Sequence, residues 1–272
     1  MEDSNRGSGE PAPTPAPELQ PPAGLSETVP PAPPVVAVAA GPEVSAFGRI
    51  PGVFFSPVTT FDSIARRPTW LLPLILWTIV SVTVTTILIP RIDFEKMMRA
   101  RLERGGQTVP EERIQAAVAM QKRLAPVLYN AIALATPTIF SLLVAAVFWG
   151  SFKSFGWDLT FLQSLGVTTH GFLPGVLGSL IFIPVLLKNA TADPTALGDM
   201  LHSNLGFLVP RNKAALHALL QSVDLFSIWT LILLVIGFSL AAKVSRKSAA
   251  AVVIVVWILF VLGKVGFAAL FT

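Results

Sequence analysis

The chain has 272 residues, of which 53% are hydrophobic and 13% are charged, with a formal net charge of +4. Soluble domains carry about 25% charged residues, so this composition excludes an ordinary soluble globular protein and indicates an integral membrane protein. Cysteine is absent, which excludes disulfides, a thiolate nucleophile and cysteine-based metal or iron–sulfur sites.

Residues 1–45 form a separate segment rich in proline and alanine. They hold eleven of the 23 prolines, in runs such as PAPTPAPELQPP, and this composition favours an extended coil that buries no core. Six acidic residues and one basic residue make the segment acidic and leave the remainder basic. We predict a disordered, solvated tail, with docking through a proline motif as the alternative. Glu2 and Asp3 follow Met1 without an apolar stretch, so no cleavable signal peptide is expected.

The segment SPVTTFDSIARRPTW, residues 56–70, predicts a short amphipathic helix. Pro57 fits the first helical turn and Pro68 ends the helix. Basic residues near the helix end complement its dipole, and an aromatic ring beside them suits the membrane interface. The predicted interfacial anchor comprises Phe61, Arg66, Arg67 and Trp70.

Five further segments are apolar enough to cross a hydrocarbon core of roughly 30 Å. Every backbone polar group in lipid must be satisfied within its own segment, so these spans are expected to be helices. The predicted fold class is an all-α membrane protein, a five-transmembrane-helix bundle with short interfacial amphipathic helices and the disordered tail. The membrane domain is predicted over residues 46–272, with spans near 71–89, 126–149, 164–187, 225–242 and 249–271.

Two connections carry helices of their own. In residues 90–125, Asp93 is expected to cap one helix, and a capping box from Thr108 to Glu111 is expected to open a second, which together predict a helical hairpin at the membrane surface. Residues 188–224 predict two short helical pieces near the interface. His202 and His217 are expected to be solvated there.

The third span, which contains HGFLPGVLGSLIFIP, combines small residues with a proline. Small residues four apart let helices approach closely, and proline kinks a helix. We interpret the pattern as close packing around a kink; a broken-helix binding site of transporter type is the alternative. The residues concerned are Gly171, Pro174, Gly175, Gly178 and Ser179.

Ionisable residues stand in or beside three spans. Lys264 lies about seven residues from the end of the fifth span and can reach the interface. Asp224 opens the fourth span on the same side, so the two are candidates for a pair, with an ion or proton pathway as the alternative. His170, near the start of the third span, is expected to have an interfacial or packing role.

Enzyme signatures are missing. The sequence contains no HExxH, no phosphate-binding GxxxxGK[ST], no GxGxxG and no GxSxG. LGDM, residues 197–200, matches the GxGD of intramembrane aspartyl proteases only superficially, because its aspartate lies outside a span and without a partner. We expect no catalytic residue, cofactor or metal. The basic residues cluster at helix ends, which favours anionic lipid headgroups and excludes a nucleic-acid platform.

Three stretches are similar to the bacterial branch of the Yip1 domain family: residues 56–76, 192–210 and 222–266. The resemblance implies a multi-pass membrane protein of the bacterial inner membrane, with five helices and a cytoplasmic N-terminal tail. Eukaryotic members are tied to vesicle trafficking through a DLYGP-type motif near the first span, which this sequence lacks. The family offers no catalytic residues to carry over.

Two functions follow as hypotheses. The first is a non-enzymatic membrane protein that organises the bilayer, partner membrane proteins or a homo-oligomer. The second is a small-solute or ion transporter or channel with a path near Pro174, Gly178 and Lys264. Counting all basic residues favours the side of the 90–125 hairpin as cytoplasmic, whereas the dense ARRP and KVSRK clusters favour the side of the tail, which we prefer.

Overall fold

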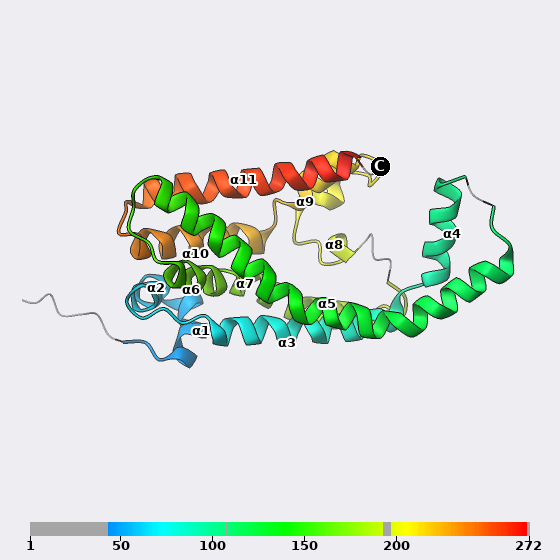
Figure 1. The fold of residues 1–272 in the computed structure, drawn as a ribbon, viewed down its shortest axis with the longest axis horizontal. Helices are drawn as coiled ribbons and strands as arrows, with labels where there is room; N and C mark the ends of the chain where they lie inside the picture. The colour runs from blue at the N-terminus through cyan, green and yellow to red at the C-terminus, as the bar shows by residue number, and fades with distance from the viewer. Residues whose placement is uncertain (1–42, 107, 193–196, 271–272) are drawn as a thin grey trace, which may run out of the picture. The chain divides into compact units, whose positions relative to one another are not determined.

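The computed structural model describes residues 43–106, 108–192 and 197–270, which are mostly helical and contain no β-strand. Long helices lie side by side in a bundle (Figure 1). The all-α membrane fold predicted from composition is therefore confirmed. The predicted tail lies outside the described residues except for residues 43–45.

Two short helices precede the first span. Helix α1 is Ala46–Phe55, and the hydroxyl of Ser45 caps it by accepting a hydrogen bond of 3.1 Å from the backbone N–H of Gly48. Helix α2 is Pro57–Arg66, with Pro57 in its first position. The predicted start and end of α2 are both found, because the two prolines that bracket it permit a helix between them and not beyond.

The first span is α3, Leu71–Leu88, followed by the short turn η1, Ile89–Arg91. Helix α4, Phe94–Arg104, begins as predicted at Asp93, whose carboxylate accepts a hydrogen bond of 2.9 Å from the backbone N–H of Lys96.

Helix α5, Glu111–Ser154, runs for 44 residues, or about 66 Å at 1.5 Å per residue. The predicted surface helix and the second span are therefore one continuous helix, and α4 packs against its first part as the other half of the predicted helical hairpin. Pro126 lies inside α5, where a proline removes one backbone hydrogen bond and bends a helix without having to end it.

Helix α4 and the first part of α5 form what we call the arm, described here by residues 94–106 and 108–125. The predicted capping box is absent, because α5 begins after Pro110 and the Glu111 carboxylate instead accepts hydrogen bonds from Arg99 at 2.6 Å and Gln115 at 2.9 Å. The arm shares a small core with η1, composed of Ile89, Phe94, Ile114, Val118 and Ala125.

The third span is broken into α6, Phe161–Gly171, and α7, Leu173–Lys188. The break follows from Pro174 in the first turn of α7, which has no N–H to continue the ladder of α6. Thr160 and Gln163 form a capping box that starts α6 three residues before the predicted span.

The rest of the chain contains one helical connection and two more spans. The connection holds α8, Leu197–Met200, the turn η3, Leu205–Leu208, and α9, Ala214–Gln221. The spans are α10, Leu225–Ala241, and α11, Arg246–Leu270.

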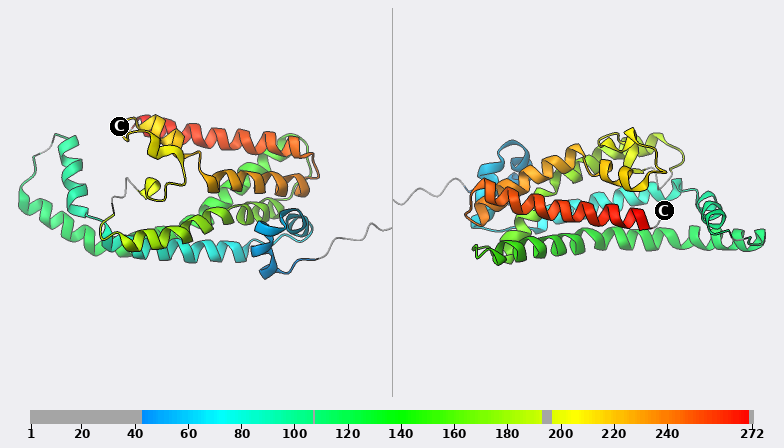
Figure 2. Two further views of the ribbon diagram at one scale, coloured as in Figure 1. Left: turned by 180° about the vertical axis from the view of Figure 1, so that it is seen from behind. Right: turned by 90° about the horizontal axis from the view of Figure 1, so that it is seen from above.

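Among the described residues, four helical segments are long and apolar enough to cross a membrane: 71–91, 111–154, 161–188 and 246–270. The fourth predicted span, α10, is apolar but has 17 residues. In the bundle, α1, α2 and the turns after α5 and α10 lie at one end, whereas the arm and the α8–α9 connection lie at the other (Figures 1 and 2). This arrangement fits a chain that passes back and forth five times.

Candidate functional site

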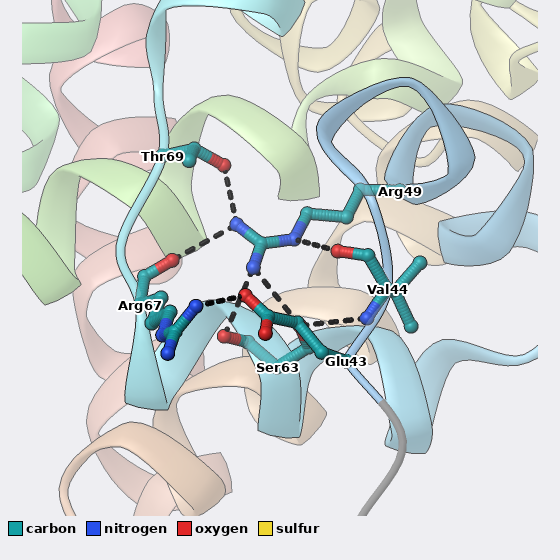
Figure 3. Close-up of polar contacts among 6 residues, drawn as sticks. All are labelled: Glu43, Val44, Arg49, Ser63, Arg67 and Thr69. Atoms are coloured by element: carbon teal, nitrogen blue, oxygen red, sulfur yellow. Dashed lines mark hydrogen bonds and ion pairs between the residues drawn. The ribbon is translucent and has the colours of Figure 1, made fainter.

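Arg49, in α1, is 2% exposed and donates hydrogen bonds from all three guanidinium nitrogens (Figure 3). Its Nε lies 3.1 Å from the carbonyl oxygen of Val44. Nη1 lies 2.9 Å from the carbonyl oxygen of Arg67 and 2.6 Å from Thr69 Oγ1. Nη2 lies 3.2 Å from the carbonyl oxygen of Ser63 and 2.9 Å from its Oγ. A buried cation is thus surrounded by neutral oxygens that use its donors fully.

The Arg49 network joins three pieces of chain that meet at one end of the bundle. The carbonyls of Ser63 and Arg67 lie at the C-terminal end of α2, where a helix leaves acceptors unpaired and favours positive charge. Glu43 forms an ion pair with the Arg67 side chain, and the Val44 N–H lies 3.3 Å from Ser63 Oγ. The sequence analysis did not predict this role for Arg49. Its position within the apolar sequence AFGRIPGVFF was the available signal.

The apolar face of α2 packs into the bundle. Phe61 and Ile64 are fully buried, and the Phe61 ring lies against Gly237 of α10, where a Cβ would come within 2.8 Å of it. Phe61 therefore does not face lipid. At the end of α2, Arg66 pairs with Asp62 at 2.8 Å, and Trp70 is half-buried in the turn before α3.

The small residues of the third span divide between packing and a cavity. A Cβ on Gly171 would lie 2.5 Å from Leu234, and one on Gly178 would lie 2.9 Å from Phe226, so both glycines allow α10 to approach closely. Pro174 is buried beside them. Gly175 is exposed, and it and Ser179 line the cavity described next.

A cavity of about 690 Å³ lies between α3, α5, α7, α10 and α11. Its wall is largely aromatic and aliphatic. On one side Trp77 makes edge contacts with Phe140 and Phe172, whose own rings are tilted against each other. Besides the indoles of Trp77 and Trp257, the side chains with polar groups on the wall are four hydroxyl residues and one carboxylate: Ser151, Ser179, Ser227, Thr230 and Asp224. This combination suits an apolar ligand with one polar end.

Asp224 caps α10 through one carboxylate oxygen. Its Oδ2 accepts hydrogen bonds from the N–H of Ser227 at 3.0 Å and from the Ser227 hydroxyl at 3.3 Å. Its Oδ1 is buried and has no hydrogen-bond partner among the described residues. Lys264 forms no ion pair with Asp224 among the described residues; its Nζ donates to Ser222 Oγ at 3.3 Å.

A second polar cluster lies in the α8–α9 connection around Asp199. Its carboxylate meets Arg211 Nε at 3.0 Å, His217 Nε2 at 3.1 Å and Gln221 Nε2 at 3.0 Å. Burial alone would raise the pKa of Asp199, but the hydrogen bonds from Gln221 and Arg211 and the charges of His217 and Arg211 together lower it. His217 is 8% exposed, so the prediction that it is solvated is wrong.

His170 is fully buried in α6, with Nδ1 2.8 Å from the carbonyl oxygen of Gly166 and no partner on Nε2 among the described residues. It packs inside the bundle and not at the interface. Within the described ranges, no group of three or more His, Asp or Glu side chains could hold a metal ion.

Comparisons with known proteins give one family. A family model described as the Yip1 domain matches residues 52–267. No curated protein and no solved structure matches the chain. The matched range contains the cavity, the Asp199 cluster, α2 and the arm, and it begins just after Arg49.

Proposed function

Since the chain belongs to the Yip1 domain family, we propose that it is a non-enzymatic membrane protein that organises partner proteins or the bilayer around its helices. The structure of the arm is the observation that supports this proposal. Residues 111–125 of α5 add about 22 Å of helix before the apolar part begins, and α4 packs on that extension (Figure 1). A packed helical pair beyond the hydrocarbon core offers a rigid surface to another protein.

The surface of the arm supports recognition of a protein. It mixes both signs of charge with two large apolar side chains, since Met120 is 63% exposed and Leu124 is 48% exposed. Apolar anchors within a polar rim are typical of protein interfaces. The proposed partner is a membrane protein or a second copy of this chain. Exposed charged residues of the arm include Lys96, Arg101, Glu103, Glu112, Arg113, Lys122 and Arg123.

The proposed location is the bacterial inner membrane, with the N-terminus in the cytoplasm and the arm on the opposite side. Arg66, Arg67, Lys243, Arg246 and Lys247 are exposed at the end of the bundle that holds α1 and α2. Positive charge at the cytoplasmic face is favoured, and it attracts anionic headgroups there.

The test is photo-crosslinking in native membranes. A photoreactive residue at position 120 of the arm should give a discrete protein adduct. The same residue at position 262, which is 58% exposed on α11, should give mainly lipid adducts. Reversing the charge of Lys122 and Arg123 should remove the adduct at unchanged abundance. Lipid adducts alone at position 120 would overturn the proposal.

A transporter or channel is the second candidate, because the cavity lies beside Pro174 and Gly178. Three features count against a solute path. The cavity wall is largely apolar, the ring of Phe226 covers Gly178, and Lys264 does not line the cavity. Solute uptake into vesicles containing the purified protein would favour this candidate, provided that Asp224→Asn abolishes uptake without lowering abundance.

A further inference from the structure

The cavity opens toward the lipid between α5 and α11. Leu143 and Val147 of α5 are 62% and 51% exposed, and Leu259 and Phe260 of α11 are 63% and 57% exposed, although all four line the cavity. These residues belong to membrane-spanning segments. The molecules that meet this opening are therefore bilayer lipids. The cavity volume of about 690 Å³ lies within the range of sites that enclose a small ligand, about 300–1,000 Å³.

The carboxylate of Asp224 favours a positively charged ligand at the polar end of the cavity. Asp224 Oδ2 is used by the first turn of α10, whereas Oδ1 is buried without a donor among the described residues. A buried carboxylate oxygen without a hydrogen bond is costly and is normally satisfied. The missing partner must carry an N–H or O–H donor, and a positive charge would pair best with the carboxylate.

We propose that the cavity binds a phospholipid with a primary amine in its headgroup, such as phosphatidylethanolamine. The ammonium group donates to Asp224 Oδ1, and an acyl chain enters the apolar cavity through the opening between α5 and α11. A choline headgroup has the charge but no N–H to donate, and a glycerol headgroup has donors but no positive charge. The site does not depend on partner binding by the arm.

Lys264 does not line the cavity, but its hydrogen-bond partner is close in the chain to Asp224. It donates to Ser222, two residues before Asp224 in the chain, so a cation and a carboxylate stand at the same end of α10. The phosphate and the ammonium of a single ethanolamine headgroup carry the complementary charges. An amine without a phosphate would leave Lys264 without this partner.

The experiment uses the full chain in vesicles that contain equal amounts of phosphatidylethanolamine, phosphatidylcholine and phosphatidylglycerol. One lipid at a time carries a photoreactive group in its acyl chain, and labelled peptides are identified by mass spectrometry. The ethanolamine lipid should label the α5 and α11 peptides that contain residues 143 and 259 about tenfold more than either of the others, as expected for a charge-assisted hydrogen bond.

Asp224→Asn should remove this preference while the protein still folds, because asparagine caps a helix as well as aspartate does. Asp93→Asn, the same change at the exposed cap of α4, is the matched control and should preserve it. Gly175→Phe places a ring in the cavity, where a Cβ at that position meets no atom within 4 Å, and should reduce labelling by all three lipids. Equal labelling by the three lipids in the wild type, an unchanged preference in Asp224→Asn, or crosslinks to a second copy through the cavity would overturn the proposal.

Discussion

Arg49 holds Ser63 by two hydrogen bonds at once, to its carbonyl oxygen at 3.2 Å and to its Oγ at 2.9 Å, through the single nitrogen Nη2. Ser63 belongs to the last turn of α2, and Arg49 belongs to α1. The pair therefore fixes α1 across the C-terminal end of α2, so that the two helices are held together by a buried cation as well as by apolar packing.

Replacing Arg49 with methionine should strongly destabilise this end of the bundle. The change leaves the carbonyl oxygens of Val44 and Arg67 and the Thr69 hydroxyl without the donors that Arg49 supplies, and each buried polar group left without its partner costs about 1–3 kcal/mol. Thermal unfolding in detergent, followed by tryptophan fluorescence, should show a clearly lower midpoint. Arg49→Lys should be intermediate, because an ammonium cannot reproduce the planar set of five donors.

Arg66→Met is the control for Arg49. It removes an exposed pair with Asp62 within α2, and such pairs contribute about 0.3–0.5 kcal/mol. Equal effects at the two positions would show that the buried network contributes no more than a surface ion pair.

Gly237→Ala should destabilise the contact between α10 and both α2 and α6. The added Cβ would lie 2.5 Å from Val167 and 2.8 Å from Phe61, and both side chains are fully buried and cannot move aside. Overpacking of this kind costs about 1–3 kcal/mol. Gly175→Ala, where the Cβ meets nothing within 4 Å, should leave the unfolding midpoint unchanged or slightly higher.

The fold class and the order of the spans follow from the sequence because apolar length and proline position act locally. Pro57 and Pro68 bracket α2 whatever the rest of the chain does. Local patterns do not determine which side chains become buried, because that depends on the tertiary packing of the helices. The local sequence pattern predicts that Phe61 lies at the membrane interface. It is buried instead, because Gly237 of α10 approaches it closely, and a contact between helices so far apart in the chain cannot be read from the local pattern.

The candidate sites were less accessible to sequence reasoning for the same reason. Asp199 meets residues 12, 18 and 22 positions further along the chain, spacings that no single helix imposes. The cavity draws its wall from helices that are distant in sequence. The sequence places Asp224 at the start of the fourth span as a candidate pair for Lys264. In the structure Lys264 donates to Ser222 instead, and Asp224 Oδ1 has no partner among the described residues.

The Asp199 cluster should lose its stabilising effect in acid. A carboxylate whose pKa is lowered in the folded state stabilises that state above its ordinary pKa, about 3.9, and this contribution disappears as the pH falls through the lowered value. The midpoint of thermal unfolding should thus be higher for the wild type than for Asp199→Asn from pH 7 to about pH 5. The difference should shrink below about pH 4.

Asp158→Asn is the control for Asp199, because the Asp158 side chain is 93% exposed and, among the described residues, meets only Lys153 at 3.4 Å. It should match the wild type at every pH. A difference between the wild type and Asp199→Asn that persists unchanged to pH 3 would mean that the amide disturbs packing and that the charge of Asp199 is not what stabilises the connection.

Lys264→Met should lower thermal stability and abundance modestly, by the equivalent of about 1 kcal/mol. The loss is one long hydrogen bond to Ser222, whose hydroxyl keeps its own acceptor, the carbonyl oxygen of Ala218, at 2.8 Å. The methionine retains most of the apolar length of lysine in a segment surrounded by lipid. Lys247→Met, at the exposed start of the same helix, should change neither quantity.

Abundance and vesicle uptake, measured on the same Lys264→Met samples, separate the two functions considered for this chain. If the role of Lys264 is structural, Lys264→Met should lower abundance, and neither the wild type nor the variant should show solute uptake. If uptake is present in the wild type and disappears in Lys264→Met at unchanged abundance, the lysine acts on a moving solute. A path through the bundle would then have to open beside Ser222, where the described side chains are packed.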